Sequence, residues 1–198
     1  MEDNYYYLDL ELKYTNKDGL LYNLAGIDDV KVLLAFESLK VSKRVEELSE
    51  QPIKIKDANT LLKIHHHLFQ DVYEWAGKLR TVNISKHGKP FFNCERFHFG
   101  FHYIDTLIFE YRKIKKTNKE QIAKKLAEIL DHVNYLHPFR EGNGRTQREF
   151  LRLLALEKGL KLNLNPPDNE NVYERYMKGA IESDVEILTK LILELLEK

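Results

Sequence analysis

The chain has 198 residues, of which 43% are hydrophobic, with 31 basic and 31 acidic side chains. This length suits one domain that buries roughly 70% of the surface of its unfolded chain. A formal charge of zero excludes a general attraction to nucleic acid, and no apolar run approaches the ~20 residues of a membrane span. The single Cys94 excludes an internal disulfide and suits a reducing compartment, and the first residues lack a signal-peptide pattern. We therefore expect a soluble protein of the cytoplasm, with no membrane or direct nucleic-acid partner.

The N-terminal part is predicted to hold an extended arm and a long helix. Residues 1–26 alternate weakly between polar and apolar side chains, which indicates an arm of the same domain. Residues 27–198 are predicted to form that single domain. Its first helix can be capped by Asp28 or Asp29 and runs to about Glu50.

A second helix and a hairpin are predicted next. The helix is expected from a cap near Asp57 to a stop at Gly77. The pattern then changes to alternation over residues 79–92, with a turn at His87-Gly88, which is typical of a β-hairpin. The apolar residues that place the helix against a core are Leu61, Leu62, Ile64, Leu68, Phe69, Val72 and Trp75.

Two longer helices are predicted in the middle of the chain. The first covers about Cys94 to Lys113. The second opens with a capping box at residues 117–120, whose first residue is a threonine and whose fourth is a glutamate. It should end at His137, because Pro138 disfavours helical geometry at the residue before it.

The predicted helix from Arg145 to Lys158 is the most apolar one and ends at Gly159. A helix that is apolar over most of its circumference is buried, so this helix should lie at the centre of the fold. Two further helices are expected after Asn165. The predicted fold class is mainly α, a helical bundle with one short β-hairpin.

His137 begins the segment of the chain, residues 137–148, that carries the most chemical information. Because it stands where a helix gives way to an irregular loop, its imidazole should be presented at the helix end rather than packed away. A ring in that place can act as a general base, which contributes about 10²–10⁴ to a rate. The alternative is a structural histidine whose nitrogens are satisfied inside the fold.

The loop after His137 has the composition of an anion site. Gly142, Asn143 and Gly144 precede a helix, whose first N–H groups are exposed and lie at the positive end of the helix dipole. Glu141 is the acid best placed to hold Mg²⁺, which at nucleotide sites takes one or two carboxylates and phosphate oxygens. Phe139 is expected to anchor the loop in the core.

Three arginines, Arg145, Arg148 and Arg152, lie on one face of the predicted central helix. Buried arginines require anions. Arg145 and Arg152 can share Glu149, but Arg148 has no acidic neighbour three or four residues away. Either a distant carboxylate or a bound phosphate must therefore satisfy Arg148.

These residues resemble the signature of the Fic (filamentation induced by cAMP) family, which reads His-x-Phe-x-Asp/Glu-Gly-Asn-Gly-Arg-x-x-Arg. The resemblance extends over roughly residues 20–195, including the segments 64–77 and 80–86. It implies a Fic-type helical bundle. The matching positions are His137, Phe139, Glu141, Gly142, Asn143, Gly144, Arg145 and Arg148.

The resemblance implies a protein adenylyltransferase, which moves AMP from ATP to a Ser, Thr or Tyr hydroxyl of a target protein. His137 would take the hydroxyl proton, and Glu141 would hold Mg²⁺ between the α- and β-phosphates. Arg145 and Arg148 would bind the β- and γ-phosphates, so Arg145 belongs to both the catalytic and the nucleotide-binding residues. The backbone of residues 142–144 would cradle the phosphates.

The hairpin is similar to the family's flap, which aligns a target segment by strand pairing. The residues that would dock the target are Lys86, His87, Gly88 and Lys89. An exposed hairpin edge is suited to that addition of a strand. The alternative is a plain surface hairpin.

Many members of the family are silenced by a helix that carries Ser/Thr-x-x-x-Glu-Gly/Asn, whose Glu pairs with the arginine equivalent to Arg148. The near match from Ser42 to Glu46 is followed by Glu47 rather than Gly or Asn. We therefore expect a small antitoxin-like protein to act in trans, with Glu46 in cis as the alternative. This arrangement implies a toxin of a bacterial toxin–antitoxin pair, and such relatives often modify a type II topoisomerase subunit.

Several alternatives stay open. The motif does not choose the donor, so transfer of UMP or phosphocholine, or removal of AMP, would use the same residues. A nucleotide-binding interaction module without turnover is a further alternative, although the intact His137 argues against it. A metal site at His65-His66-His67 is disfavoured, since consecutive helical residues point about 100° apart.

Overall fold

The computed structural model describes residues 5–7, 13–86, 88–165 and 169–197. Within these residues it contains seven α-helices, one 3₁₀-helix and three short strands. None of the described helices combines the length and apolarity needed to cross a membrane. The elements are β1 (Tyr5–Tyr7), α1 (Val30–Glu50), α2 (Thr60–Phe69), β2 (Ile84–Lys86), β3 (Lys89–Pro90), the 3₁₀-helix η1 (Cys94–Arg96), α3 (Phe97–Lys113), α4 (Lys119–Leu136), α5 (Asn143–Glu157), α6 (Glu170–Glu182) and α7 (Val185–Leu195).

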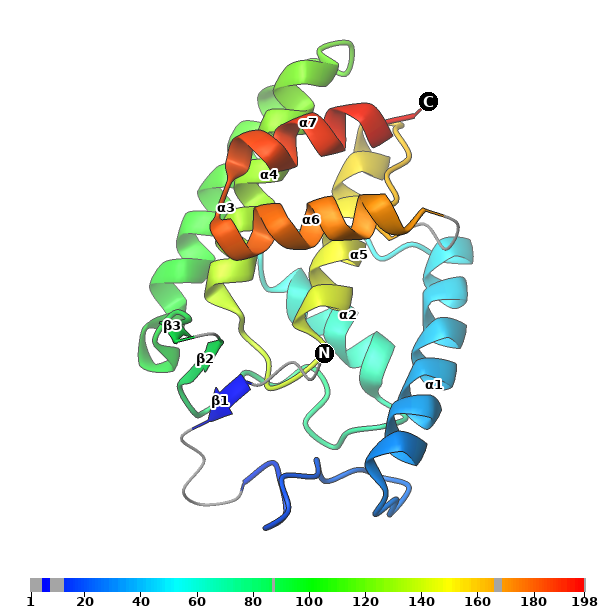
Figure 1. Cartoon of the computed structure of the whole chain (residues 1–198). Helices are drawn as coiled ribbons and strands as arrows, with labels where there is room; N and C mark the ends of the chain where they lie inside the picture. Colours follow the sequence, from blue (N-terminus) through cyan, green and yellow to red (C-terminus); the bar gives the residue numbers. More distant parts are fainter. Residues whose placement is uncertain (1–4, 8–12, 87, 166–168, 198) are drawn as a thin grey trace.

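The core lies around α4 and α5. Helix α4 packs against α3, α5, α6 and α7, and α5 packs against α2 as well. Figure 1 shows α1 and α3 at opposite sides of the bundle, with α6 and α7 running across it. Apolar residues of α5 from Phe150 to Ala155 are buried, whereas Leu156 is 42% exposed. The predictions of a mainly helical fold and of a central motif helix are confirmed.

Helix α1 begins where the sequence indicates. Asp29 is the N-cap, because its side chain accepts a hydrogen bond from the Val32 N–H at 2.9 Å. This bond satisfies one of the N–H groups that have no acceptor within the helix. The choice between Asp28 and Asp29 is thereby settled for Asp29.

The prediction of one helix from Asp57 to Gly77 is wrong, because α2 covers only Thr60–Phe69. The chain continues through successive turns, in which the Val72 and Tyr73 N–H groups both donate to the Phe69 carbonyl. Val72 is still fully buried. Its apolar side chain reaches the core from a turn, so the apolar pattern persists beyond the end of the helix.

The predicted hairpin is present but shorter than residues 79–92, and it carries a third strand. Strand β2 pairs antiparallel with β3, and Gly88 adopts the positive φ of 75° in the turn between them. The N-terminal strand β1 pairs antiparallel with the other edge of β2, which opposes Tyr6 to Ser85. The parts of the arm at residues 1–4 and 8–12 lie outside the described residues.

Helix α4 begins one residue later in the capping box than predicted. The N-cap is Asn118, whose side chain accepts a hydrogen bond from the Gln121 N–H at 3.1 Å. Thr117 is exposed and lies outside the helix. Asparagine is at least as good a cap as threonine, and the shift of one residue places Gln121 in reach of it.

Replacement of the cap tests this assignment. Asn118→Ala should lower the free energy of unfolding by about 1 kcal/mol, because the Gln121 N–H loses its acceptor. Thr117→Ala is the matched control and should change it by less than about 0.5 kcal/mol. Urea denaturation followed by circular dichroism measures both. A larger loss for Thr117→Ala would show that Thr117 caps the helix instead.

Candidate active site

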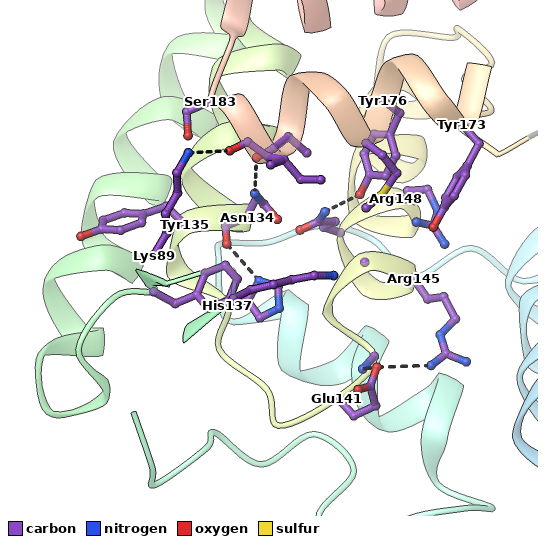
Figure 2. A pocket seen from close by; sticks show the side chains of 18 of the residues that line it. Lys89, Asn134, Tyr135, His137, Glu141, Arg145, Arg148, Tyr173, Tyr176 and Ser183 are labelled. Atoms are coloured by element: carbon purple, nitrogen blue, oxygen red, sulfur yellow. Dashed lines mark hydrogen bonds and ion pairs between the residues drawn. The ribbon is translucent and has the colours of Figure 1, made fainter. Parts of the chain in front are cut away.

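A cavity of about 440 Å³ lies between the hairpin and the helices α4, α5 and α6. His137, Asn134 and Lys89 lie on one side of it, and Arg145 and Arg148 lie on the other (Figure 2). The structure thus brings the predicted base, acid and arginines to one cavity. The lining residues that come from the motif are His137, Glu141, Gly142, Gly144, Arg145, Gln147 and Arg148.

His137 ends α4 in a left-handed conformation, with φ 43° and ψ 60°. The predicted helix end at this residue is confirmed. A non-glycine residue in this region costs about 1–2 kcal/mol and needs support from its surroundings. Arg80 supplies part of it, because its Nε donates to the His137 carbonyl at 2.8 Å and its backbone N–H donates to the Pro138 carbonyl at 2.9 Å.

Arg80 also connects this corner to the hairpin. Its Nη1 and Nη2 atoms donate to the carbonyls of Val82 and Phe92, which flank the two strands, at 2.6 and 2.5 Å. The side chain is 2% exposed, and this burial lowers its pKa to about 10. Because the buried Arg80 guanidinium donates to carbonyls of both the hairpin and the end of α4, it holds the two in a fixed relative position.

The His137 ring is covered rather than openly presented, which corrects the sequence-based expectation. It is 5% exposed and stacks on Phe91 at a centroid distance of 3.8 Å. Burial is the main cause that lowers its pKa to about 3, so the ring is neutral near pH 7. Its Nδ1 lies 3.0 Å from the Asn134 carbonyl and therefore carries the hydrogen. In the neutral ring, Nε2 then holds the lone pair that can accept a proton.

The loop before α5 is closed by its own residues. The Asn143 amide accepts from the Phe139 N–H at 2.9 Å and donates to the Phe139 carbonyl at 2.8 Å. Gly142 has φ 79°, and a Cβ there would lie 2.3 Å from the Phe69 ring. Gly142 is thus required by backbone conformation and packing, and only the backbone of Asn143 is left to meet a phosphate.

His65 holds the loop from α2, a role that the sequence did not reveal. Its Nδ1 accepts from the Gly77 N–H at 2.8 Å, so its Nε2 donates to the Glu141 carbonyl at 3.0 Å. The ring is fully buried and stacks on Phe139 at 3.8 Å, which confirms Phe139 as the anchor of the loop. Burial lowers the pKa of His65 to about 3, which keeps this pair of hydrogen bonds intact near neutral pH.

The sequence places Glu149 within reach of both Arg145 and Arg152, but in the structure Arg145 pairs with a different acid. Its Nη2 lies 2.7 Å from a carboxylate oxygen of Glu37 on α1 and 3.8 Å from Glu141. Glu149 pairs with Arg152, at 2.8 Å, and with no other basic residue among those described. The partner of Arg145 comes from a helix more than a hundred residues away, which spacing within α5 cannot indicate.

The Glu141 carboxylate is placed to receive a cation. Its side chain is 31% exposed, and one oxygen accepts from the Gly142 N–H at 2.8 Å. Desolvation in the cavity raises its pKa, opposed by the Gly142 N–H and by Arg145. One carboxylate with phosphate oxygens is a usual ligand set for Mg²⁺ at nucleotide sites, so the residue fits that ion.

Arg148 pairs with no carboxylate among the described residues. Its guanidinium lies 5.8 Å from the centre of the Tyr173 ring and 5.5 Å from that of Tyr176, both on α6. The Tyr176 hydroxyl is held by the Gln147 amide. Since cation–π contacts do not neutralise a charge, Arg148 is available to an anion in the cavity.

The hairpin contributes Lys86 and Lys89 to the same cavity. The Lys89 ammonium donates to the Ile181 carbonyl on α6 at 3.4 Å, so it reaches across the mouth of the cavity. His87 lies outside the described residues. The hairpin edge is less open than the sequence suggested, because β1 covers one side of β2 and β3 covers the other.

These features define a class of site that handles phosphate compounds: a neutral imidazole, two arginines, an acid and the N-terminus of a helix around one cavity. The first N–H groups of α5 have no acceptor within their own helix, and Gly144 of this turn lines the cavity.

The chain is similar to known proteins in sequence and in fold. The sequence matches the Fic/DOC family over residues 55–155. It is 37% identical over 172 residues to protein adenylyltransferase VbhT of Bartonella schoenbuchensis, an overlap of 86% of this chain and 35% of VbhT. It is 35% identical over 145 residues to the probable protein adenylyltransferase y4lH of Sinorhizobium fredii, covering 73% of this chain and 74% of y4lH. The BepC protein of Bartonella tribocorum with bound AMPPNP superposes with a TM-score of 0.81 at 21% identity, over 94% of this chain and 97% of that one.

The chain belongs to the Fic/DOC family, and the resemblance seen in residues 137–148 is confirmed. The likeness to BepC concerns the fold. The chain spans 35% of the length of VbhT.

The two buried histidines predict a loss of stability in acid. Both have a folded-state pKa of about 3, below the ordinary value of 6.5. At a pH below 6.5 the unfolded chain therefore binds protons that the folded chain does not. Between about pH 7.5 and pH 5.5 the free energy of unfolding should fall by about 1.4 kcal/mol per histidine. Urea denaturation at both pH values measures this fall. In His137→Asn the fall should be about half of that in the wild type, because only His65 remains to cause it. An equal fall in His137→Asn would contradict the burial of a neutral ring at this position.

Proposed function

We propose that this protein is an adenylyltransferase that moves AMP from ATP to a Ser, Thr or Tyr hydroxyl of a target protein. The observation that carries the proposal is the placement of His137 and of the two arginines, Arg145 and Arg148, around one cavity at the start of α5. The names of VbhT and y4lH support the same activity.

The proposed reaction begins with a target hydroxyl beside Nε2 of His137. The hydroxyl oxygen attacks the α-phosphorus of ATP as its proton passes to Nε2. A bond forms between that oxygen and phosphorus, the bond from the α-phosphorus to the oxygen bridging the β-phosphorus breaks, and pyrophosphate leaves. The hydrogen bond from Nδ1 to Asn134 holds the ring in the tautomer that this step requires.

The phosphates are assigned to the start of α5. The backbone of residues 142–144 cradles them, with the N–H groups of Asn143 and Gly144 as donors, and Arg145 and Arg148 bind the β- and γ-phosphates. Glu141 would hold Mg²⁺, which supplies charge neutralisation as pyrophosphate departs. The chain's own contribution is orientation: His65 and Asn143 fix the loop so that these groups point at one place.

The donor base is assigned to the α6 side of the cavity, where Met177 and Ile181 offer an apolar surface. Nothing in the motif selects adenine over another base. Transfer of UMP or phosphocholine is therefore an alternative that a comparison of ATP, UTP and CDP-choline as donors tests. Removal of AMP from an already modified target is a further alternative.

Regulation is proposed to come from a separate antitoxin-like protein that places a carboxylate on Arg148. The supporting observation is that Arg148 has no acidic partner within the described chain and lies beside tyrosines at the edge of the cavity. Glu46 is exposed and forms no ion pair with Arg148 among the described residues, which argues against inhibition in cis. In this proposal the protein is a toxin of the bacterial cytoplasm, and a type II topoisomerase subunit is the first target to try.

Loss of the base tests the reaction. Intact-mass analysis of the protein and of a bacterial lysate after incubation with Mg²⁺ and ATP should show a gain of one AMP on a target protein. His137→Ala should lower the rate by at least about 10², because Nε2 is absent, while ATP still binds. Full transfer by His137→Ala would exclude His137 as the base, and ATP binding without transfer by the wild type would favour a binding module.

The hairpin is proposed to align the target by strand pairing. Strand β1 already occupies one edge of β2. The Ile84 carbonyl accepts from the Phe91 N–H, so it points toward β3. Backbone polar groups alternate along a strand, and those of Ser85 therefore point toward β1, where a target strand would bond. The outer edge of β3 contains Pro90, which has no N–H to offer. The proposal is that a target displaces β1 and pairs with β2 in its place.

Weakening β1 should consequently favour the target. Tyr6→Pro removes the N–H opposite Ser85 and should lower the KM for a protein target severalfold, on the order of the 0.5–1.5 kcal/mol of one hydrogen bond, while the KM for ATP stays the same. Tyr6→Phe is the control and should behave like the wild type. Steady-state kinetics with a purified target measure both constants, and a higher KM for the target in Tyr6→Pro would show that β1 belongs to the docking surface.

A further inference from the structure

Glu37 is a buried acid outside the part of the chain that matches the family. It lies in the middle of α1, is 4% exposed, and precedes the matched residues 55–155. Burying a carboxylate is unfavourable unless it is paired and hydrogen-bonded. Its position therefore needs an explanation that the family signature does not supply.

Both oxygens of Glu37 are engaged. One lies 2.7 Å from Nη2 of Arg145, and the other accepts a hydrogen bond from the Tyr73 hydroxyl. Tyr73 is 2% exposed and stacks on Trp75 at 4.3 Å. Since the carboxylate is held from behind by a fixed ring, it cannot follow Arg145 if that side chain moves.

The arrangement leaves most of the Arg145 guanidinium available. Its carbon lies 4.7 Å from the centre of the Phe69 ring, and Nε and Nη1 have no hydrogen-bond partner among the described residues. A guanidinium is planar and rigid, so fixing one nitrogen and one face sets the direction of the others. Because Arg145 lines the cavity, these contacts set the direction of its Nε and Nη1 atoms there.

Glu37 also determines which acid Arg145 pairs with. Glu141, four residues before Arg145 on the motif, is the next carboxylate, at 3.8 Å from the same Nη2. Without Glu37, Nη2 of Arg145 would keep only its ion pair with Glu141, and Arg145 would compete with a cation for that carboxylate. We propose that Glu37 is a positioning residue, which holds Arg145 toward the phosphates of the nucleotide and limits its pairing with Glu141. This inference rests on the proposed function, in which Arg145 binds phosphate and Glu141 binds Mg²⁺.

Nucleotide binding tests the role without reference to turnover. The dissociation constants of ATP and AMP are measured by calorimetry at about 0.1 and about 10 mM Mg²⁺. Glu37→Gln should weaken ATP about tenfold at low Mg²⁺, which corresponds to about 1.4 kcal/mol, and less at high Mg²⁺, when the ion displaces Arg145 from Glu141. AMP, which lacks the phosphates assigned to Arg145, should change by less than about twofold.

Two further variants separate the interpretations. Tyr73→Phe removes only the bond behind Glu37 and should change ATP binding in the same direction by a smaller factor, even if Glu37→Gln does not fold. Glu50→Gln, at an exposed position of the same helix, should match the wild type.

Each other result overturns the inference in its own way. Tighter ATP binding by Glu37→Gln would make Glu37 an inhibitor of Arg145. Equal weakening of ATP and AMP, without recovery at high Mg²⁺, would make it a structural residue, and unchanged binding would remove it from the site. ATP binding by the wild type checks the proposed function separately, because the wild type must bind ATP before the variants are compared.

Discussion

The site depends on the connection between the two central helices. Residues 137–142 reverse the chain between α4 and α5, and both ends of this turn have a positive φ, at His137 and at Gly142. Such a turn is not stable by itself, because a non-glycine residue at positive φ costs about 1–2 kcal/mol. The Asn143 amide closes it from within, and Arg80 holds it from outside by donating to the His137 carbonyl. The catalytic geometry is therefore a property of buried polar bonds, each of which is satisfied by backbone.

Charge in the cavity is distributed unevenly, and this distribution follows from burial. His137 is neutral because its ring is covered, so it can accept a proton rather than attract phosphate. The two arginines lie across the cavity from His137, where Arg145 is balanced by Glu37 and Arg148 by no acid within the described chain. Lys89 lies on the same side as His137. In the proposed function, the phosphates of a nucleotide would lie at the two arginines, and a neutral base would lie at the target end.

The sequence allowed the motif to be interpreted well because the motif is local. Pro138 predicts the end of α4, and the apolar run from Phe150 predicts a central α5, since both depend on neighbouring residues. The errors have a common cause in tertiary structure. Apolar residues after Phe69 enter the core from turns, so periodicity extended α2 too far.

Contacts between elements far apart in the sequence could likewise not be predicted from the spacing of residues. Arg145 pairs with Glu37 rather than with Glu149, and β1 covers one edge of the hairpin. Both ring nitrogens of His65 are hydrogen-bonded, and the bond to the Glu141 carbonyl connects residues that are 76 positions apart.

The elements around the cavity and its two arginines divide into two kinds. The loop, α5 and the hairpin lie within the residues that match the family, whereas α1 with Glu37 and α6 with Tyr173 and Tyr176 lie outside them. The matched part contains every group that the proposed reaction requires: base, acid and phosphate-binding residues. The unmatched parts contact the two arginines from opposite sides, one through a carboxylate and the other through aromatic rings. Because an arginine acts in the direction in which its neighbours hold it, helices beyond the signature can tune phosphate binding while the signature stays the same.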